Sequence, residues 1–375
     1  MFGLDTHKDL HSEQGGMPGE HPGRSRNPII KVSGLAWLEF EKPDLRDAEA
    51  FTAAFGLTTA SAGPGELQLR GTDAGGPCVL IRRGSASRLT AIAFSAADDA
   101  DLARLADATG SKVTALPEDL GGAAVTLRDP NGFAVRVVSG THVLSELPSQ
   151  EPHVFNFGHN QPRTNATQRP PRAPARVQRL GHVVLQVNKY IEALNWYLDH
   201  FGLIVSDFQY YIGQRERGPV MSFIRCDRGS VPSDHHTLAM GLGAVNRYLH
   251  SAYEVCDLDA LAAGGEYLTD RGYHRSWGIG RHVQGSQIFD YWRDPDGIMV
   301  EHYTDGDVFD STVEPGWAPF AASGLAQWGP PATADFLGTT PKDVPRELRS
   351  MIGALRGDNE WDVRALAGLI KASRA

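Results

Sequence analysis

The sequence predicts an α+β fold made of two domains, each containing two βαβββ modules. The chain has 375 residues, which is more than a single hydrophobic core usually serves, so two domains are the starting expectation. The two halves of the chain also resemble each other in three stretches that occur in the same order. Between the halves, residues 146–176 are rich in proline and carry no apolar period, which indicates a linker.

The internal repeat is the strongest of these observations. Three pairs of segments match: residues 34–40 with 179–185, residues 88–94 with 248–254, and residues 128–136 with 293–301. The last pair agrees almost residue for residue around an Arg-Asp-Pro-Asx-Gly run. Three matches in one order are improbable by chance, so the sequence indicates a duplicated unit.

Each unit follows one pattern of secondary structure. It starts with a largely apolar strand, continues through an amphipathic helix, and ends in strands joined by tight turns such as the Asp-Pro-Asx-Gly run. The strand-and-helix start occurs twice within each half, so four βαβββ modules are the simplest interpretation.

The remaining segments complete the predicted organisation. The N-terminal stretch is polar and rich in Gly and Pro, and we expect it to be mobile. The C-terminal stretch has prolines ahead of helical patterns at about 343–355 and 360–373. The predicted parts are a mobile tail at 1–27, a first domain at 28–145, a linker at 146–176, a second domain at 177–308 and a helical appendage at 309–375.

Composition excludes several classes of function. The net charge of -9 argues against a general nucleic-acid binder, which needs clustered Lys and Arg, and favours a small-molecule partner. Three irregularly spaced cysteines suggest neither disulfides nor a thiolate zinc site, so a reducing cytoplasm is expected. No apolar run approaches the roughly 20 residues that span a bilayer. A homo-oligomer is expected because symmetric assemblies are common.

The two halves differ at positions suited to metal binding. The aligned repeats pair His182 with Trp37, His250 with Thr90, and Glu301 with Arg136. Histidine is absent from residues 28–141, whereas eight of the fourteen histidines fall within 182–302. The sequence therefore predicts a metal-free first domain and a metal site in the second.

Two imidazoles and one carboxylate define the chemistry of this site. This donor set leaves one face of an octahedral metal open, as in non-haem iron(II) oxygenases, so Fe(II) is the first choice. Zinc accepts the same donors and Mn(II) suits the carboxylate, and the sequence does not separate these metals. His182 alone would more often be structural, but a Glu301 inside an apolar strand is rare without a partner.

Further motifs in the second half resemble one family. They are Leu180-Gly181-His182, the run 235–240 followed by Leu249-His250, Gly280-Arg281-His282, Tyr291 ten residues ahead of Glu301, and the closing run 301–307. As a set they are similar to the type I extradiol dioxygenases of the vicinal oxygen chelate superfamily, such as 2,3-dihydroxybiphenyl and catechol 2,3-dioxygenases. The resemblance covers roughly residues 30–308. It implies the vicinal oxygen chelate fold in both domains and extradiol (meta) cleavage of a catechol, with dioxygen as co-substrate at a mononuclear Fe(II).

The resemblance also implies roles for individual residues. His182, His250 and Glu301 match the iron ligands. His236 matches the acid–base catalyst, a task for which an imidazole that titrates near neutrality is suited. His282 and Tyr291 match residues that hydrogen-bond the catechol oxygens, although Tyr291 would also fit a core position. The chain departs from several relatives at Gly285, where they have an acidic residue.

Other residues receive weaker assignments. The substrate pocket is expected near Val184, Met240, Gln284 and Trp277, and Trp277 would equally suit the packing of a loop. His235 is expected to be structural or solvent-facing, because neighbouring strand residues point to opposite faces. His200, His274 and His302 are expected to have no catalytic role.

Two other functions remain open at this point. One is a glyoxalase-like isomerase or a metal-dependent hydrolase of the same superfamily. The other is a catalytically silent protein that binds an aromatic ligand.

Overall fold

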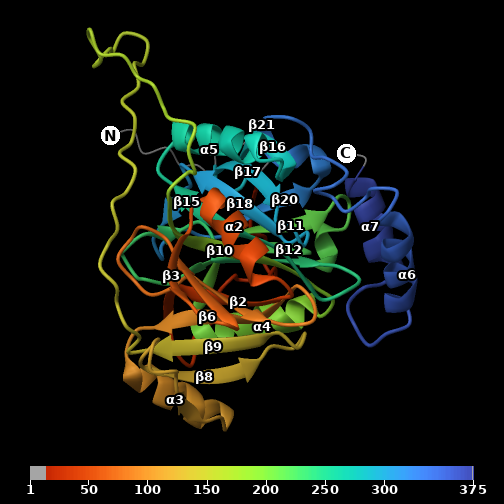
Figure 1. The fold of residues 1–375 in the computed structure, drawn as a ribbon. Helices are drawn as coiled ribbons and strands as arrows, with labels where there is room; N and C mark the ends of the chain where they lie inside the picture. The colour runs from red at the N-terminus through yellow and green to blue at the C-terminus, as the bar shows by residue number, and fades with distance from the viewer. Residues whose placement is uncertain (1–13, 374) are drawn as a thin grey trace.

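The computed structural model describes residues 14–373 and 375, and its framework is a pair of β-sheets (Figure 1). The first half contributes two successive modules: β2 (Val32–Lys42), α2 (Leu45–Phe55), β3 (Thr58–Ala62), β4 (Glu66–Arg70) and β5 (Val79–Arg83), then β6 (Arg88–Ala96), α3 (Asp99–Thr109), β7 (Val113–Ala115), β8 (Ala123–Arg128) and β9 (Ala134–Ser139). Their strands form an eight-stranded sheet in the order β3-β4-β5-β2-β6-β9-β8-β7.

The second half repeats this arrangement. Its modules are β10 (Val177–Val187), α4 (Tyr190–Phe201), β11 (Leu203–Tyr211), β12 (Met221–Cys226) and β14 (Leu238–Leu242), then β15 (Arg247–Val255), α5 (Leu258–Asp270), β16 (His274–His282), β17 (Ile288–Arg293) and β18 (Met299–Thr304). They pair in the order β11-β12-β14-β10-β15-β18-β17-β16, which is the order of the first sheet. The predicted α+β fold with four βαβββ modules is therefore confirmed.

Segments outside the modules extend the second sheet at both edges. At one edge β20 (Gly316–Phe320) pairs with β11, and β1 (Gln14–Gly15) pairs with β20. At the other edge β21 (Ala326–Trp328) pairs with β16. A separate pair joins β13 (Ser233–Asp234) to β19 (Val308–Phe309). These additions satisfy backbone groups that an open sheet edge would leave unpaired.

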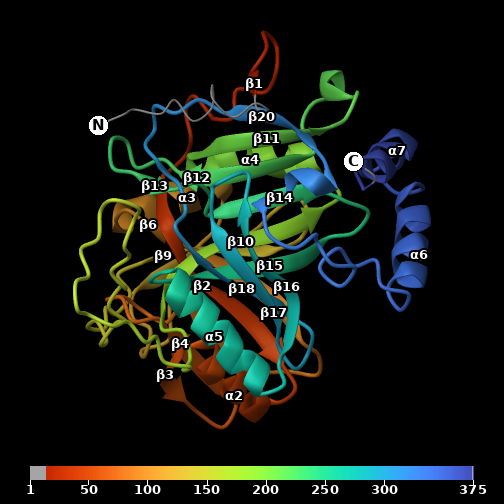
Figure 2. The same cartoon turned by 90° about the horizontal axis from the view of Figure 1, so that it is seen from above.

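Short and terminal helices complete the fold. The 3-10 turns η1 (Arg215–Arg217) and η2 (Ala322–Gly324) lie in connections, and α6 (Val344–Ala354) and α7 (Val363–Ala372) follow near the C-terminus. The last two helices match the predicted positions and lie together at one side of the molecule (Figure 2). None of the helices in the described residues has the length and apolar character needed to span a bilayer.

The prediction of a mobile tail at 1–27 needs correction for its described part. Residues 14–27 lie against the second sheet. Arg24 forms an isolated antiparallel β-bridge with Ile204, and the ring of His21 forms a hydrogen bond with the side chain of Asn195 at 2.9 Å. These partners, a backbone β-bridge to β11 and a side-chain hydrogen bond to α4, are not revealed by composition alone. Residues 1–13 lie outside the described part of the chain.

Local sequence signals explain the helix ends. In α2, the Asp44 side chain accepts the backbone N–H groups of Arg46 and Asp47, which caps the first turn. The helix ends at Gly56, whose φ of 107° belongs to the left-handed region. A Cβ at this position would lie 1.5 Å from the carbonyl oxygen of Ala175, so glycine also lets the chain before β10 pass close by.

The strand pairing corrects one position of the repeat alignment. His250 lies opposite Val184, and in the first half Ala91 lies opposite Glu39, the residue at the same position of the repeat. The counterpart of His250 is therefore Ala91, one residue away from the predicted Thr90. The apolar runs of these strands contain no landmark that fixes their register by sequence.

The two halves pack closely against each other. One hydrophobic core includes buried residues of both halves, and α2 lies beside α5 (Figure 2). The buried ammonium of Lys42 in β2 contacts the carboxylates of Asp294 and Asp296 in the turn before β18. His302 in β18 is fully buried, and its Nε2 lies 2.6 Å from the carbonyl oxygen of Phe55. The first half thus supports both the turn before β18 and β18 itself.

Candidate metal centre

Three adjacent strands bring His182, His250 and Glu301 together. These strands are β10, β15 and β18, which are neighbours in the second sheet. The Nε2 atoms of His182 and His250 lie 3.3 and 3.2 Å from Oε2 of Glu301. One donor atom from each of the three residues lies within 4.8 Å of the others. The residues predicted as metal ligands therefore form one cluster.

A bulge in β10 sets the direction of the first histidine. The pairing with β15 shifts between Leu180 and His182, so that Gly181 is an extra residue in the strand. A Cβ on Gly181 would come within 2.2 Å of the hydroxyl oxygen of Tyr303. Glycine is required here because the buried Tyr303 side chain occupies that space.

The electrostatics of the cluster favour a bound cation. Glu301 is fully buried, and within the described residues neither of its carboxylate oxygens has a hydrogen-bond partner. Burial alone would raise the pKa of Glu301, but the side chains of His182 and His250 hold it well below its ordinary value. Burial lowers the pKa of His250, although the Glu301 carboxylate opposes this shift, and the neutral imidazole is the form that binds a metal. A buried carboxylate beside two imidazoles is the environment that a divalent metal ion fits.

His236 lies against this cluster. Its ring centroid is 4.0 Å from that of His182, and only 4% of the residue is exposed. Burial, followed by the neighbouring histidines, lowers the pKa of His236 well below its ordinary value. The neutral imidazole is the form that can accept a proton.

The solvent-facing interpretation of His235 is wrong. The residue is buried, with Nε2 at 2.5 Å from Oδ2 of Asp207 and Nδ1 at 3.1 Å from Nδ1 of His236. Residues 235–237 lie between β13 and β14 and belong to no strand, so the alternation that guided the prediction does not apply. Asp207 in β11 was not found from sequence, because it lies 28 residues before its partner.

His282 and Tyr291 form a second hydrogen-bonded pair beside Glu301. His282 Nδ1 lies 2.8 Å from the carbonyl oxygen of Leu325, which can only accept, so Nδ1 carries the proton. His282 Nε2 then accepts the hydrogen bond of the Tyr291 hydroxyl at 2.8 Å. Nε2 is also 3.8 Å from Oε1 of Glu301. Burial lowers the pKa of His282 and raises that of Tyr291, which preserves this neutral pair.

The predicted pocket residues divide into two groups. Val184 lies opposite His250 on the same pair of strands, so it borders the donor cluster. Met240 belongs to the main hydrophobic core instead, and its predicted contact with substrate is not supported. Its neighbour Ala239 pairs with Val184 on one side and with Phe223 on the other.

Phe223 is therefore a candidate that sequence reasoning missed. Its ring centroid lies 5.2 Å from that of His236, in an edge-to-face arrangement. No sequence motif contains this residue, and only the order β10-β14-β12 in the sheet brings it to the site.

Gln284 and Trp277 are held by other side chains and by the appendage. Gln284 Oε1 accepts a hydrogen bond from Gln209 at 3.1 Å. Trp277 stacks 5.7 Å from Tyr291, and its indole N–H donates to the carbonyl oxygen of Pro330 at 2.9 Å. Trp277 thus packs against the Tyr291 ring and is itself held by the appendage.

The corresponding positions of the first half have a different composition. Arg136, at the position of Glu301, forms an ion pair with Glu39 at 3.2 Å. Trp37, at the position of His182, donates its indole N–H to the same Glu39 at 3.0 Å. Indole, guanidinium and the methyl group of Ala91 offer no lone pair to a metal.

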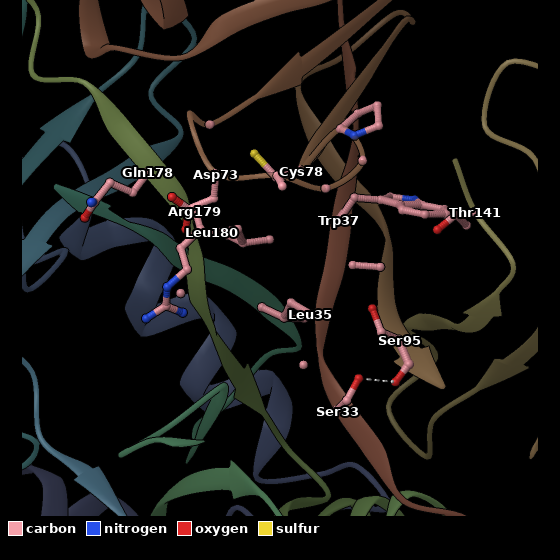
Figure 3. A pocket seen from close by; sticks show the side chains of 18 of the residues that line it. Ser33, Leu35, Trp37, Asp73, Cys78, Ser95, Thr141, Gln178, Arg179 and Leu180 are labelled. Carbon is pink, nitrogen blue, oxygen red and sulfur yellow. Dashed lines mark hydrogen bonds between the residues drawn. The ribbon is translucent and has the colours of Figure 1, made fainter. Parts of the chain in front are cut away.

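A cavity of about 570 Å³ adjoins this first-half position. Figure 3 shows Trp37 and Leu35 of β2 on one side and Arg179 and Leu180 of β10 across from them. The cavity reaches Gly181 but is not lined by His182, His250 or Glu301. It is therefore distinct from the donor cluster.

Known proteins resemble this chain along most of its length. The model of the Glyoxalase/Bleomycin resistance protein/Dioxygenase superfamily matches residues 179–302. Metapyrocatechase 2 of Cupriavidus necator is 30% identical over 341 residues, which cover 90% of this chain and 99% of that protein.

Solved structures share the fold. The Mn(II)-bound glyoxalase from Novosphingobium aromaticivorans has a TM-score of 0.67 at 22% identity, covering 81% of this chain and 94% of its own. The 2,3-dioxygenase LapB from Pseudomonas sp. KL28 has a TM-score of 0.64 at 15% identity, covering 78% and 98%.

Proposed function

This chain belongs to the type I extradiol dioxygenases of the vicinal oxygen chelate superfamily, and from that premise we propose that it cleaves a catechol at Fe(II) held by His182, His250 and Glu301. The observation that carries the proposal is the buried Glu301 carboxylate, which lacks hydrogen bonds within the described residues and faces two imidazoles. A carboxylate so placed is stable only with a compensating cation.

The donor set supports the choice of metal. Two imidazoles and a carboxylate leave coordination positions open, which suits Fe(II) oxygenase chemistry, and Mn(II) accepts the same donors. When bound, such an ion supplies a Lewis-acidic centre with room for a diol and dioxygen. The homologous metapyrocatechase supports a dioxygenase over an isomerase or a silent binder.

The surrounding side chains have separate roles in substrate binding and in proton transfer. We assign His236 as the base that takes a proton from a catechol hydroxyl, since its neutral imidazole lies against His182. The Tyr291 hydroxyl donates its hydrogen bond to His282, and its oxygen lies beside Glu301 with a lone pair that can accept a hydrogen bond from a substrate hydroxyl. Val184 and Phe223 offer apolar surface to the ring.

The overall reaction is balanced without an added reductant. The ring bond beside the diol breaks, and both atoms of dioxygen enter the product, which carries a new carboxylic acid and a new carbonyl group. Burial of the site excludes bulk water, which would compete for the open positions.

The test combines metal analysis with oxygen uptake. Protein purified without oxygen is analysed for iron and manganese, then mixed with a panel of catechols that includes 3-substituted ones. We expect iron near one per chain, one dioxygen consumed per catechol, and a yellow ring-opened product. His250→Ala should lose metal and activity.

The matched control is His274→Ala, which removes an exposed histidine of β16 and should leave both unchanged. A bound metal with no oxygen uptake on any catechol would contradict the proposal and favour the isomerase or hydrolase. The expectation of a cytoplasmic homo-oligomer stays a prediction.

A further inference from the structure

The histidine proposed as the base has two buried partners behind it. We propose that Asp207 and His235 are positioning residues that fix the tautomer of His236, so that its Nε2 presents a lone pair to the substrate. The inference rests on the proposed role of His236 in ring cleavage.

The three side chains form a continuous chain of contacts. Oδ2 of Asp207 lies 2.5 Å from Nε2 of His235, and Nδ1 of His235 lies 3.1 Å from Nδ1 of His236. Asp207, His235 and His236 are 2%, 1% and 4% exposed, so water does not compete for these hydrogen bonds.

The protein holds the middle ring in place from several sides. The backbone N–H of His235 donates to the carbonyl oxygen of Asp307 at 2.9 Å, and its carbonyl accepts from the Ser206 hydroxyl at 2.6 Å. The ring lies near Phe223 and Phe309, with centroids 5.6 and 5.4 Å away. A Cβ on Gly285 would lie 2.9 Å from Nδ1 of His235. Gly285, the departure noted in the sequence, thus leaves room for this ring.

The direction of each hydrogen bond follows from elementary chemistry. An ionised carboxylate only accepts, so the proton between Asp207 and His235 belongs to Nε2 of His235. In the neutral form that we propose for His235 the ring carries one N–H, so its Nδ1 is an acceptor. The proton between the two Nδ1 atoms therefore belongs to His236. Its other nitrogen, Nε2, is left without a proton.

This tautomer is the one that general-base catalysis needs. When His236 takes a proton at Nε2, its Nδ1–H remains bonded to His235, with the Asp207 charge behind it. A carboxylate that acts through an imidazole in this way sets tautomer and orientation without itself taking the proton. A doubly protonated His235 would reverse the second hydrogen bond and leave His236 protonated on Nε2.

The first experiment reads the tautomer directly. Full-length protein with 15N-labelled histidine is loaded with Zn²⁺, which is diamagnetic, and long-range 1H–15N correlation spectra identify the protonated nitrogen of each ring. His236→Gln assigns the signal by its loss. We expect wild-type His236 to be protonated on Nδ1 and Asp207→Asn to shift it toward Nε2, because the amide can donate to His235.

The second experiment compares two variants of His235. His235→Phe keeps an aromatic ring between Phe223 and Phe309 but removes both hydrogen bonds. His235→Gln is the matched variant, since its amide both donates and accepts. We expect kcat of His235→Phe to fall about 100-fold with KM and metal content nearly unchanged, and His235→Gln to recover part of this loss.

Either of two results would overturn the inference: a wild-type His236 protonated on Nε2, or a folded His235→Phe variant with wild-type kcat. If His235→Phe does not fold, the wild-type and Asp207→Asn spectra still decide. Wild-type protein with the expected tautomer but no oxygen uptake would refute the proposed function and leave the hydrogen-bond assignment standing.

Discussion

The ion pair between Lys42 of the first half and Asp294 of the second allows a quantitative test of how the first half supports β18, the strand that carries Glu301. Lys42 and Asp294 have side chains that are each 5% exposed, and Lys42 also contacts Asp296 at 3.0 Å. In Lys42→Met, Asp294 becomes a buried carboxylate without its cation. Removing one partner of a buried pair costs about 3–5 kcal/mol. Asp294 keeps the backbone N–H groups of residues 296 and 298, so we expect the lower end, about 3 kcal/mol.

A double-mutant cycle separates this cost from the value of the pair itself. Lys42→Met combined with Asp294→Asn leaves no buried charge, so we expect the double variant to be more stable than Lys42→Met alone. The free energy of unfolding is measured by urea denaturation of metal-loaded protein. The matched control is Lys31→Met, which breaks the more exposed pair with Asp227 and should cost at most about 1 kcal/mol. Equal costs for Lys42→Met and Lys31→Met would refute the reasoning.

Three further outcomes are expected. In Gly181→Ala, the new methyl group displaces the buried Tyr303 ring at a cost of about 1–3 kcal/mol, and metal binding weakens; an unchanged metal Kd in titrations would contradict this. Tyr291→Phe removes the donor to His282 and should lower kcat about tenfold at constant metal content, measured by oxygen uptake; unchanged kcat would argue against the pair. Burial raises the pKa of Asp129 from 3.8 to about 6, so the folded state binds this proton more tightly than the unfolded state does. The stability that proton binding adds to the folded state is therefore lost as pH rises from 3.8 to about 6. The free energy of unfolding of Asp129→Asn, measured by denaturation at a series of pH values, should therefore rise relative to that of wild type across this interval. A difference between the two proteins that does not change with pH would contradict the assignment.

The donor cluster could be predicted because it depends on the repeat. Aligning the halves places His182, His250 and Glu301 on equivalent central strands, and neighbouring strands of one sheet bring such residues together whatever the loops do. The same alignment paired His250 with Thr90, whereas the strand pairing shows that its counterpart is Ala91, one residue further on. Strand register is set by pairing with a neighbour, and an apolar run gives no sign of it.

Some of the residues around the cluster could not be predicted, for two physical reasons. Asp207 and Phe223 reach the site through the order of strands in the sheet, which local sequence does not encode. Leu325 acts through its backbone carbonyl, and every residue has one, so no residue type marks it. Met240 lies in the hydrophobic core because side chains alternate along β14, and its neighbour Ala239 is the residue that pairs with Val184 and Phe223.

The Arg136–Glu39 pair has a consequence for how the protein depends on its metal supply. A guanidinium that is covalently part of the chain neutralises the Glu39 carboxylate of the first half permanently, whereas Glu301 in the second half would rely on the proposed metal ion, which can dissociate. Chelation should therefore loosen the molecule asymmetrically, with hydrogen exchange accelerating around β10, β15 and β18 while β2, β6 and β9 stay protected. The first half would thus form a framework whose charges are balanced without a metal ion, and the second half would complete its site only when the metal binds.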